Sequence, residues 1–310
     1  MGSAPPLPFV AVLAGPTASG KTGLAVELAR LLGGEVVNAD SQQVYRGLDV
    51  GTAKPTPAER AAAPHHLLDV AGPGDAMDAA RWASLADAAI ADIGARGALP
   101  IVVGGTGLYL RALLHGVVAA PGRDPALRAR LEAEAEREGR AAVHRRLAAV
   151  DPEAAARIRE NDLVRVIRAL EIAASGRTQS DLFAAHAFAP RRYRYRLLAL
   201  DVPRDELHRR IDARAAAIAR GGIVDEARAL AASPGGLPAR LPIGYADAAA
   251  RARDEIDDAE LERRIAVAHR RYARRQVIWL RREQDVEWVR PPVDVPALAD
   301  ALARALRTAP

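Results

Sequence analysis

The chain of 310 residues contains no cysteine, which excludes disulfides and thiolate metal ligands and fits a reducing compartment. Aromatic residues make up only 4%, so we expect a core of Ala, Leu, Val and Ile. No apolar run approaches the ~20 residues of a membrane span. The segment Met1–Pro8 has no basic flank of the kind that begins a signal peptide. We therefore expect a cytoplasmic protein with no membrane segment.

Apolar residues make up half of the chain, 50%, which is enough to bury a large core. At this length we expect a full α/β domain with an added lobe. The formal net charge is +5. This small excess suits a polyanionic partner, although composition alone does not identify one.

A phosphate-binding loop is the clearest motif, because residues 15–22 read GPTASGKT and match Gly-x4-Gly-Lys-Thr. The apolar run Phe9–Ala14 precedes it and the helical pattern Lys21–Leu32 follows it, the context that such a loop requires. We expect its N–H groups and the helix start to bind a diphosphate. The predicted diphosphate site comprises Gly15, Pro16, Thr17, Ala18, Ser19, Gly20, Lys21 and Thr22. Lys21 should reach the terminal phosphate, and Thr22 should ligate Mg²⁺.

The acidic residue that nucleotide hydrolases place after a second apolar strand is missing, since the strand at 100–103 leads into Gly104-Gly105-Thr106. Asp40 instead ends a strand predicted at 35–39, on the same edge as the phosphate loop. A carboxylate there could take a proton from an attacking hydroxyl or amine. It could equally be a turn or helix-capping residue, and position alone leaves both open.

Strands alternate with helices, which predicts an α/β fold with a parallel sheet like that of P-loop NTPases. Expected strands lie at 9–14, 35–39, 67–70, 100–103 and 196–202, and expected helices include 81–93, 204–220, 224–232, 258–282 and a short one in the tail. Between Asp124 and His186 the pattern is almost entirely helical. We therefore predict a core domain of 1–111 and 196–310 with a helical insertion domain at 112–195.

The stretch from Leu261 to Arg282 holds eight arginines and one acid, Glu262. Solvated helices usually mix charges, so this bias suggests contacts with the phosphates of a nucleic acid. A solvated face in an arginine-rich protein remains the alternative. The basic and aromatic run at 191–196 is better interpreted as a strand entering the core. His65 and His66 have no acid at ligand spacing, which argues against a metal site.

With these motifs in view, the chain resembles the tRNA dimethylallyltransferases (tRNA isopentenyltransferases) from Val10 to about Trp288. The resemblance rests on GPTASGKT at 15–22, DSQQVYRGLDVGTAKP at 40–55, HHLLDV at 65–70, VVGGTGLYLRALL at 102–114, DPALRARLE at 124–132, NDLVRVIRALE at 161–171, GY at 244–245 and RRQVIWLR at 274–281. The second of these segments is far more specific than the phosphate loop alone.

The resemblance implies transfer of a dimethylallyl group from dimethylallyl diphosphate to N6 of adenosine 37, beside the anticodon of tRNA. The products would be N6-isopentenyladenosine and diphosphate. It implies that Asp40 is the general base and that Lys21, Thr17 and Arg214 assist at the diphosphate, with Mg²⁺ on Thr22. The target base would have to leave its stack to reach the donor. A monomer is the default expectation.

The resemblance also implies a set of residues that contact tRNA. These are Asp40, Ser41, Gln42, Gln43, Thr106, Arg128, Arg165, Arg168, Tyr245, Arg274, Arg275, Gln276 and Arg281. The chain departs from the family pattern at Ala246, where Lys or Arg is common, at Ile278, where Thr is common, and at Ile218, where Met is common. These departures weaken individual contacts expected with RNA, those around 241–246 most of all, and leave the donor site unaffected.

Three other functions share some of these features. A small-molecule kinase would use the same loop and core, but it leaves the arginine-rich helix and the insertion unexplained. A prenyltransferase that modifies free AMP or ATP would use the same donor, and the basic C-terminal helix argues against it. A noncatalytic RNA-binding protein would not need Asp40 within its specific motif.

Overall fold

The computed structural model describes residues 7–118, 120–186, 191–233 and 241–307. The chain divides into two compact units, one of residues 1–114 with 191–310 and one of residues 115–190. The second unit is shorter at both ends than the insertion expected at 112–195. The second unit ends at residue 190 and not at 195 because the side chains of Arg192 and Tyr193 both hydrogen-bond to Asp87 of the first unit, each at 2.6 Å.

The first unit is built on a six-stranded sheet whose order is β3-β2-β4-β1-β5-β6. Every strand pair in it is parallel, as the alternation of strands and helices predicted. The strands are β1 Phe9–Ala14, β2 Gly34–Asn38, β3 His65–His66, β4 Leu99–Gly104, β5 Arg194–Leu200 and β6 Val286–Val289. The predicted P-loop NTPase-like fold is thus confirmed.

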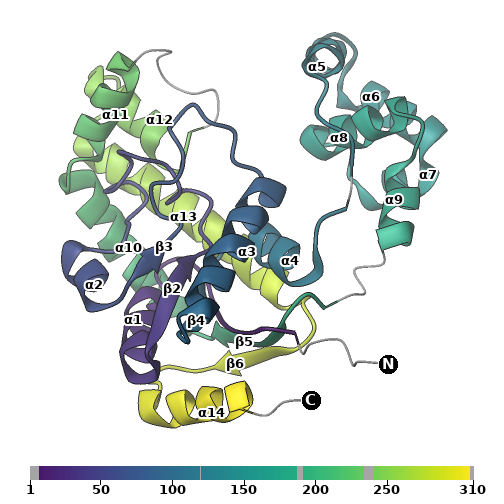
Figure 1. The fold of residues 1–310 in the computed structure, drawn as a ribbon. Helices are drawn as coiled ribbons and strands as arrows, with labels where there is room; N and C mark the ends of the chain where they lie inside the picture. Colours follow the sequence, from purple (N-terminus) through teal and green to yellow (C-terminus); the bar gives the residue numbers. More distant parts are fainter. Residues whose placement is uncertain (1–6, 119, 187–190, 234–240, 308–310) are drawn as a thin grey trace, which may run out of the picture. The chain divides into compact units, whose positions relative to one another are not determined.

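Alternate residues of β1 build two separate cores on the two faces of the sheet, as a period of two requires. Val10 and Val12 pack in a cluster with residues of α3 (Ala79–Ala95) and α4 (Gly107–His115). Ala11 and Leu13 pack with residues of α1 (Lys21–Leu32) and α14 (Val295–Arg307). Figure 1 shows these helices on either side of the strands. The central strand β1 is therefore buried on both faces and ends directly at the phosphate loop.

One predicted strand lies at other residues in the structure, and one strand was not predicted. The third strand was expected at 67–70 but lies at His65–His66. It ends there because Leu67 and Asp69 have left-handed φ angles of 63° and 60°, which an extended strand cannot contain. The edge strand β6 was not predicted. It has four residues, none of them fully buried, so its apolar alternation is weak.

A helical bundle completes the first unit. It consists of α10 Arg204–Arg220, α11 Ile223–Ala232, α12 Tyr245–Ala252 and α13 Asp258–Leu280, and the short α2 Pro57–Ala62 lies nearer the sheet. The bundle has a core of its own around Tyr245, Leu261 and Ile265. The far end of α13 joins the sheet core through Leu280, so one helix links the two cores. In the described part of the chain, no helix has the length and apolar character to cross a membrane.

Helices are the only regular secondary structure among the described residues of the second unit. Its helices are α5 Pro125–Glu138, α6 Arg140–Val150, α7 Pro152–Arg157, α8 Leu163–Ala174 and α9 Gln179–His186. Asp124, Asp151 and Asp162 each cap a helix by accepting hydrogen bonds from its first N–H groups, which fixes where α5, α7 and α8 begin. A separate core forms around Leu131, Leu147 and other apolar side chains.

Candidate active site

The phosphate loop turns sharply between β1 and α1. Gly15, Ala18 and Gly20 have φ angles of 153°, 63° and 92°, so the tightest part of the turn includes a residue with a side chain, Ala18. Such a conformation costs about 1–2 kcal/mol for a non-glycine residue and persists only where neighbours hold it. The N–H of Thr17, directly before Ala18, donates to Oε1 of Gln276 at 2.8 Å.

Two glycines at the end of β4 let three loops meet at one edge of the sheet. β4 lies between β2 and β1. A Cβ on Gly104 would collide with the carbonyl oxygen of Ala39, and one on Gly105 would lie 2.9 Å from the oxygen of Gly15 and collide with the Gln276 amide. The Gly-Gly pair that replaces a strand-end acid therefore allows the Asp40 loop and the phosphate loop to approach each other.

One pocket holds the predicted base, the phosphate-loop lysine and Arg214 together. Its lining is Thr17, Lys21, Thr22, Ala25, Val36, Asn38, Asp40, Gln43, Pro55, His65, Val103, Gly104 and Arg214. A second, adjoining pocket shares Lys21, Thr22 and Arg214 and runs along the outside of the loop past Ser19, Lys54 and Arg210. The structure thus brings all four predicted catalytic residues, including Thr17, to one place.

The charges in this pocket influence one another. Burial lowers the pKa of Lys21, Asp40 partly offsets this by raising it, and Arg214 lowers it further, so that the resulting pKa is about 8. Burial also lowers the pKa of Arg214, and Asp40 again opposes that effect. The Nε atom of Arg214 is buried without a hydrogen-bond partner, while its Nη2 donates to the oxygen of Thr52 at 3.3 Å. Two cations therefore share one carboxylate, which leaves positive charge for an anionic ligand.

A chain of hydroxyl groups extends from Asp40 along the sheet edge. The N–H of Ser41 donates to Oγ1 of Thr106 at 3.0 Å, and the Thr106 hydroxyl donates to that of Ser41 at 3.3 Å. Tyr272 of α13 hydrogen-bonds to both hydroxyls, and burial followed by Asp40 raises its pKa to about 12. Tyr272 was not among the site residues predicted from the sequence. Its spacing of one turn from Gln276 was the signal that both belong to the site.

Several residues predicted to contact tRNA are instead engaged inside the protein. The Gln43 amide donates to the oxygens of Thr52 and Ala53 at 3.2 and 3.0 Å, and Oε1 of Gln42 accepts from the N–H of Ile243 at 3.2 Å. Tyr245 has no exposed surface, and its hydroxyl donates to Glu226 at 2.6 Å.

Gln276 is likewise buried, with 4% exposure. Because neither Tyr245 nor Gln276 presents a surface in this structure, their predicted tRNA contacts are not supported by their positions.

The three predicted RNA-contacting arginines of the helical unit differ in their surroundings. Arg128 lies 2.9 Å and Arg168 3.6 Å from the carboxylate of Glu171, whose side chain is fully buried. Arg168 also donates to the oxygen of Pro121 at 2.6 Å. Within the described part of the chain, Arg165 pairs with Asp162, the residue that caps its helix, and its side chain is 75% exposed. Among the three, only Arg165 is largely free to meet a partner without disturbing the core.

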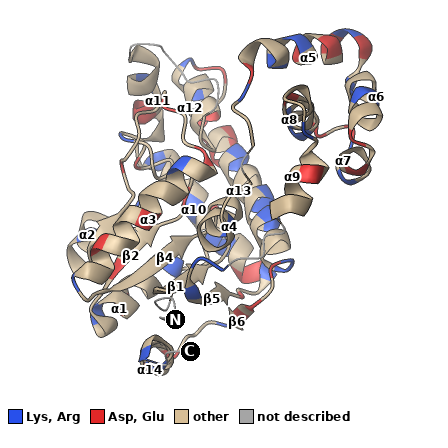
Figure 2. Cartoon of the chain, turned by 45° about the vertical axis from the view of Figure 1, so that its right-hand side comes forward, with Lys and Arg blue, Asp and Glu red and all other residues tan. Residues whose placement is uncertain are grey.

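The arginines of α13 divide into two groups along the helix (Figure 2). In the N-terminal half, Arg263 and Arg264 pair with Glu260 at 2.6 Å, and Arg270 pairs with Asp212. Towards the C-terminus, no ion pair is recorded within the described residues for Arg271, Arg274, Arg275, Arg281 or Arg282, and Arg275 lies over the Tyr272 ring at 5.5 Å. Glu260 of the same helix and acids of other helices neutralise the first group, so the surface suited to phosphates is confined to the second.

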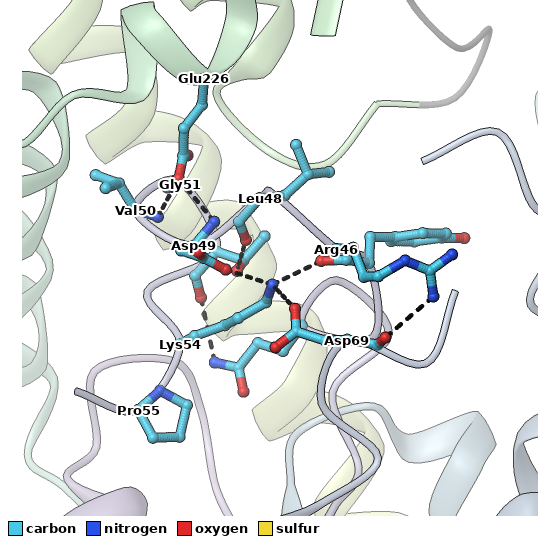
Figure 3. A network of polar contacts seen from close by, with 12 residues as sticks. Arg46, Leu48, Asp49, Val50, Gly51, Lys54, Pro55, Asp69 and Glu226 are labelled. Carbon is cyan, nitrogen blue, oxygen red and sulfur yellow. Dashed lines mark hydrogen bonds and ion pairs between the residues drawn. The ribbon is translucent and has the colours of Figure 1, made fainter. Parts of the chain in front are cut away.

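The loop after the Asp40 segment is held by a polar network that sequence analysis missed (Figure 3). Lys54 is 8% exposed and bridges Asp49, Asp69 and the oxygen of Tyr45. Glu226 of α11 accepts hydrogen bonds from the N–H groups of residues 49, 50 and 51 at 2.7, 2.7 and 3.0 Å. This network fixes the carbonyl groups of residues 52 and 53, which receive Arg214 and Gln43.

The chain matches two family models, "IPP transferase" over residues 43–283 and "Isopentenyl transferase" over residues 8–71. A tRNA dimethylallyltransferase of Anaeromyxobacter dehalogenans is 73% identical over 289 residues, covering 93% of this chain and 97% of that one. The tRNA dimethylallyltransferase of Myxococcus xanthus is 51% identical over 290 residues, covering 93% and 94%.

Solved structures agree with these relatives. The tRNA isopentenylpyrophosphate transferase of Bacillus halodurans is 35% identical with a TM-score of 0.69, and 96% of each chain is covered. A eukaryotic dimethylallyltransferase whose structures capture it acting on tRNA has a TM-score of 0.76 at 26% identity, covering 96% of this chain and 78% of that one.

Proposed function

The chain belongs to the tRNA dimethylallyltransferase family, and we propose that it transfers a dimethylallyl group from dimethylallyl diphosphate to N6 of adenosine 37 in tRNA. Its membership makes it a prenyltransferase that acts on tRNA. The donor, the target atom, the base and the metal are the finer parts of the proposal. They rest on the residues that meet in the Asp40 pocket.

The donor end of the pocket supports a diphosphate leaving group. The phosphate loop supplies N–H groups and the start of α1, and Lys21 and Arg214 supply positive charge within the same lining. An allylic carbon–oxygen bond breaks more readily when the departing charge is stabilised by groups already in place. We assign Lys21 and Arg214 to that role, with Thr17 and the rest of residues 15–22 forming the cradle.

A magnesium ion fits the same place. The Thr22 hydroxyl lines both pockets and has no recorded hydrogen bond within the described residues. A single hydroxyl together with diphosphate oxygens and waters is a donor set that Mg²⁺ accepts, because this ion usually retains several waters. The described residues contain no cluster of three carboxylate or histidine ligands, so Thr22 would hold the ion with the substrate. When bound, it would neutralise charge on the diphosphate.

Asp40 is suited to the proton transfer. The N6 amine of adenine is a weak nucleophile, so it needs orientation and removal of its proton as it attacks. The N6–carbon bond forms at C1 of the dimethylallyl group, the C1–oxygen bond breaks, and diphosphate leaves with the electron pair. The N6 proton passes to the Asp40 carboxylate, whose Oδ1 is oriented by the N–H of Gln42 at 2.8 Å. Ser41 and Thr106 would contact the same nucleotide.

The observation that carries this proposal is the shared pocket of Asp40, Lys21 and Arg214, because a base lies beside a site for a diphosphate. A small-molecule kinase or a prenyltransferase of free AMP or ATP would also use such a pocket. The relatives are named as tRNA dimethylallyltransferases and cover more than nine-tenths of the chain. They therefore favour neither the kinase nor the free-nucleotide prenyltransferase. We further propose that the protein is cytoplasmic, because tRNA is its substrate, and that it acts as a monomer, the default expectation for this chain.

Labelled dimethylallyl diphosphate tests the proposal directly. The protein is incubated with Mg²⁺, the labelled donor and unmodified tRNA, with AMP and ATP as parallel acceptors. We expect label in tRNA, in N6-isopentenyladenosine at position 37 after digestion, and its loss with Asp40→Ala. Label in AMP or ATP would select the free-nucleotide reaction. ATP consumption without prenyl transfer would select a kinase.

A further inference from the structure

Gln276 is the contact between α13 and the phosphate loop. Its Oε1 accepts from the N–H of Thr17 at 2.8 Å, and its Nε2 donates to the oxygen of Gly105 at 3.0 Å. Both hydrogen bonds are buried, and they join residues 259 and 171 positions apart in the chain. One side chain thus ties the phosphate loop to the end of β4.

We propose that Gln276 is a positioning residue for the donor diphosphate and not a contact for tRNA. The inference rests on the donor site proposed above. Thr17 directly precedes Ala18, whose φ of 63° requires support from its surroundings. The hydrogen bond from the Thr17 N–H to Gln276 fixes the peptide that leads into this turn. The N–H groups of the following residues are then directed towards the phosphates.

Glutamine is the residue type that this position requires. Its amide presents one acceptor and one donor side by side, and the site offers one N–H and one carbonyl oxygen. Glutamate cannot donate when ionised, and lysine or arginine cannot accept. Gly105 has no Cβ, and a Cβ there would displace the amide. The glycine and the glutamine therefore form a matched pair.

The position of Gln276 has a consequence for α13. The same helix carries Arg274 and Arg275, whose side chains are exposed with no recorded ion pair among the described residues. Gln276 lies next to them in sequence but faces inward, with 4% exposure. Neighbouring residues of one short segment are thus assigned to two substrates, the arginines to RNA and the glutamine to the donor.

Inorganic pyrophosphate binding tests the assignment without catalysis. Calorimetry with Mg²⁺ would compare the wild type, Gln276→Met, which keeps the length and removes both hydrogen bonds, and Arg263→Ala as an α13 control. We expect Gln276→Met to bind pyrophosphate about tenfold more weakly, to bind tRNA as the wild type does, and to raise the donor KM. Unchanged pyrophosphate binding, or a loss confined to tRNA binding, would overturn the inference.

Gln276→Glu supplies a second test that a purely structural role would not pass. A protonated glutamic acid has one donor and one acceptor, as the amide does, whereas the carboxylate faces the Gly105 oxygen. Relative to the wild type at each pH, pyrophosphate binding by Gln276→Glu should recover as the pH falls. A ratio that stays constant with pH would contradict the inference. Failure of the wild type to bind pyrophosphate would instead refute the donor site itself, and the inference with it.

Discussion

Asp40 opposes the effect of burial on Lys21. Burial alone pushes the lysine towards its neutral form, the carboxylate in the same pocket favours the ammonium, and the resulting pKa is about 8. The base proposed for the acceptor therefore also maintains the charge proposed for the donor. Changes at Asp40 should affect both ends of the reaction.

Replacing Asp40 tests the base. We expect Asp40→Asn to lower the rate of prenyl transfer about 10²–10⁴-fold, because the amide cannot accept the N6 proton. It should leave the tRNA dissociation constant nearly unchanged. Single-turnover rates with saturating tRNA measure the first effect, and filter binding measures the second. A rate close to that of the wild type would remove Asp40 from this role.

The pKa of Lys21 predicts how donor binding depends on pH. The ammonium is held below pH 8 and lost above it, so pyrophosphate affinity should decline as the pH rises through about 8. Lys21→Met should bind weakly and lack this component of the profile. A wild-type profile identical in shape to that of Lys21→Met would contradict the prediction.

The free energy of unfolding depends on the Lys21 proton in the opposite direction, because it should rise with pH whereas pyrophosphate affinity falls. The unfolded chain keeps the Lys21 proton to about pH 10.5, and the folded chain releases it near pH 8. Between these values the unfolded state binds more protons, so the contribution of Lys21 to stability rises with pH. Comparing urea unfolding of the wild type and Lys21→Met across this window measures it. The free energy of unfolding of the wild type should rise relative to that of Lys21→Met as the pH rises.

The two groups of arginines on α13 offer a matched comparison for RNA binding. Arg274→Ala with Arg275→Ala should weaken tRNA binding and reduce its salt dependence by a slope of about 1 for each phosphate that is no longer neutralised. Arg263→Ala with Arg264→Ala removes the same charge from the same helix, but these side chains pair with Glu260. The control should change the slope little. Equal slopes for the two double variants would mean that net charge, not position, governs binding.

Glu226 should matter for stability through the loop that it holds. Glu226→Gln weakens the acceptor for three backbone N–H groups and for Tyr245. We expect a loss of about 1–3 kcal/mol in the free energy of unfolding, and about 1 kcal/mol for Tyr245→Phe, which removes one hydrogen bond. Denaturant unfolding measures both. If Tyr245→Phe lowered the free energy of unfolding more than Glu226→Gln does, Glu226 would not be the main support of this loop.

Local patterns predicted the parts of the site that lie within one segment. The phosphate loop and the parallel sheet follow from glycines, apolar runs and strand ends that are close in sequence, whereas Asp40 was chosen as the base only through the family resemblance. Gln276 was assigned to tRNA and Tyr272 was not singled out, because their partners lie in the Asp40 segment, the phosphate loop and the end of β4. The pairing of Arg270 with Asp212 was equally invisible, since Asp212 belongs to another helix.

Backbone conformation explains the remaining differences. Nothing in the apolar run at 67–70 reveals that Leu67 and Asp69 adopt left-handed angles, or that the Asp69 carboxylate pairs with Lys54. Glu171 looks like one more surface acid in an arginine-rich helix, yet its side chain is buried against Arg128. In both cases a tertiary contact overrides what the local sequence favours.

The hydrogen bond between Thr17 and Gln276 also matters while the chain is being translated. A phosphate loop encoded near the start of the chain is completed by a residue encoded near its end, and β1 must likewise wait for β5, which follows the helical unit. Translation proceeds from the N-terminus, so a nascent chain still short of α13 has the glycine loop without its support. We expect ribosome-bound intermediates and truncated products that lack α13 to bind the proposed donor more weakly than the finished protein does.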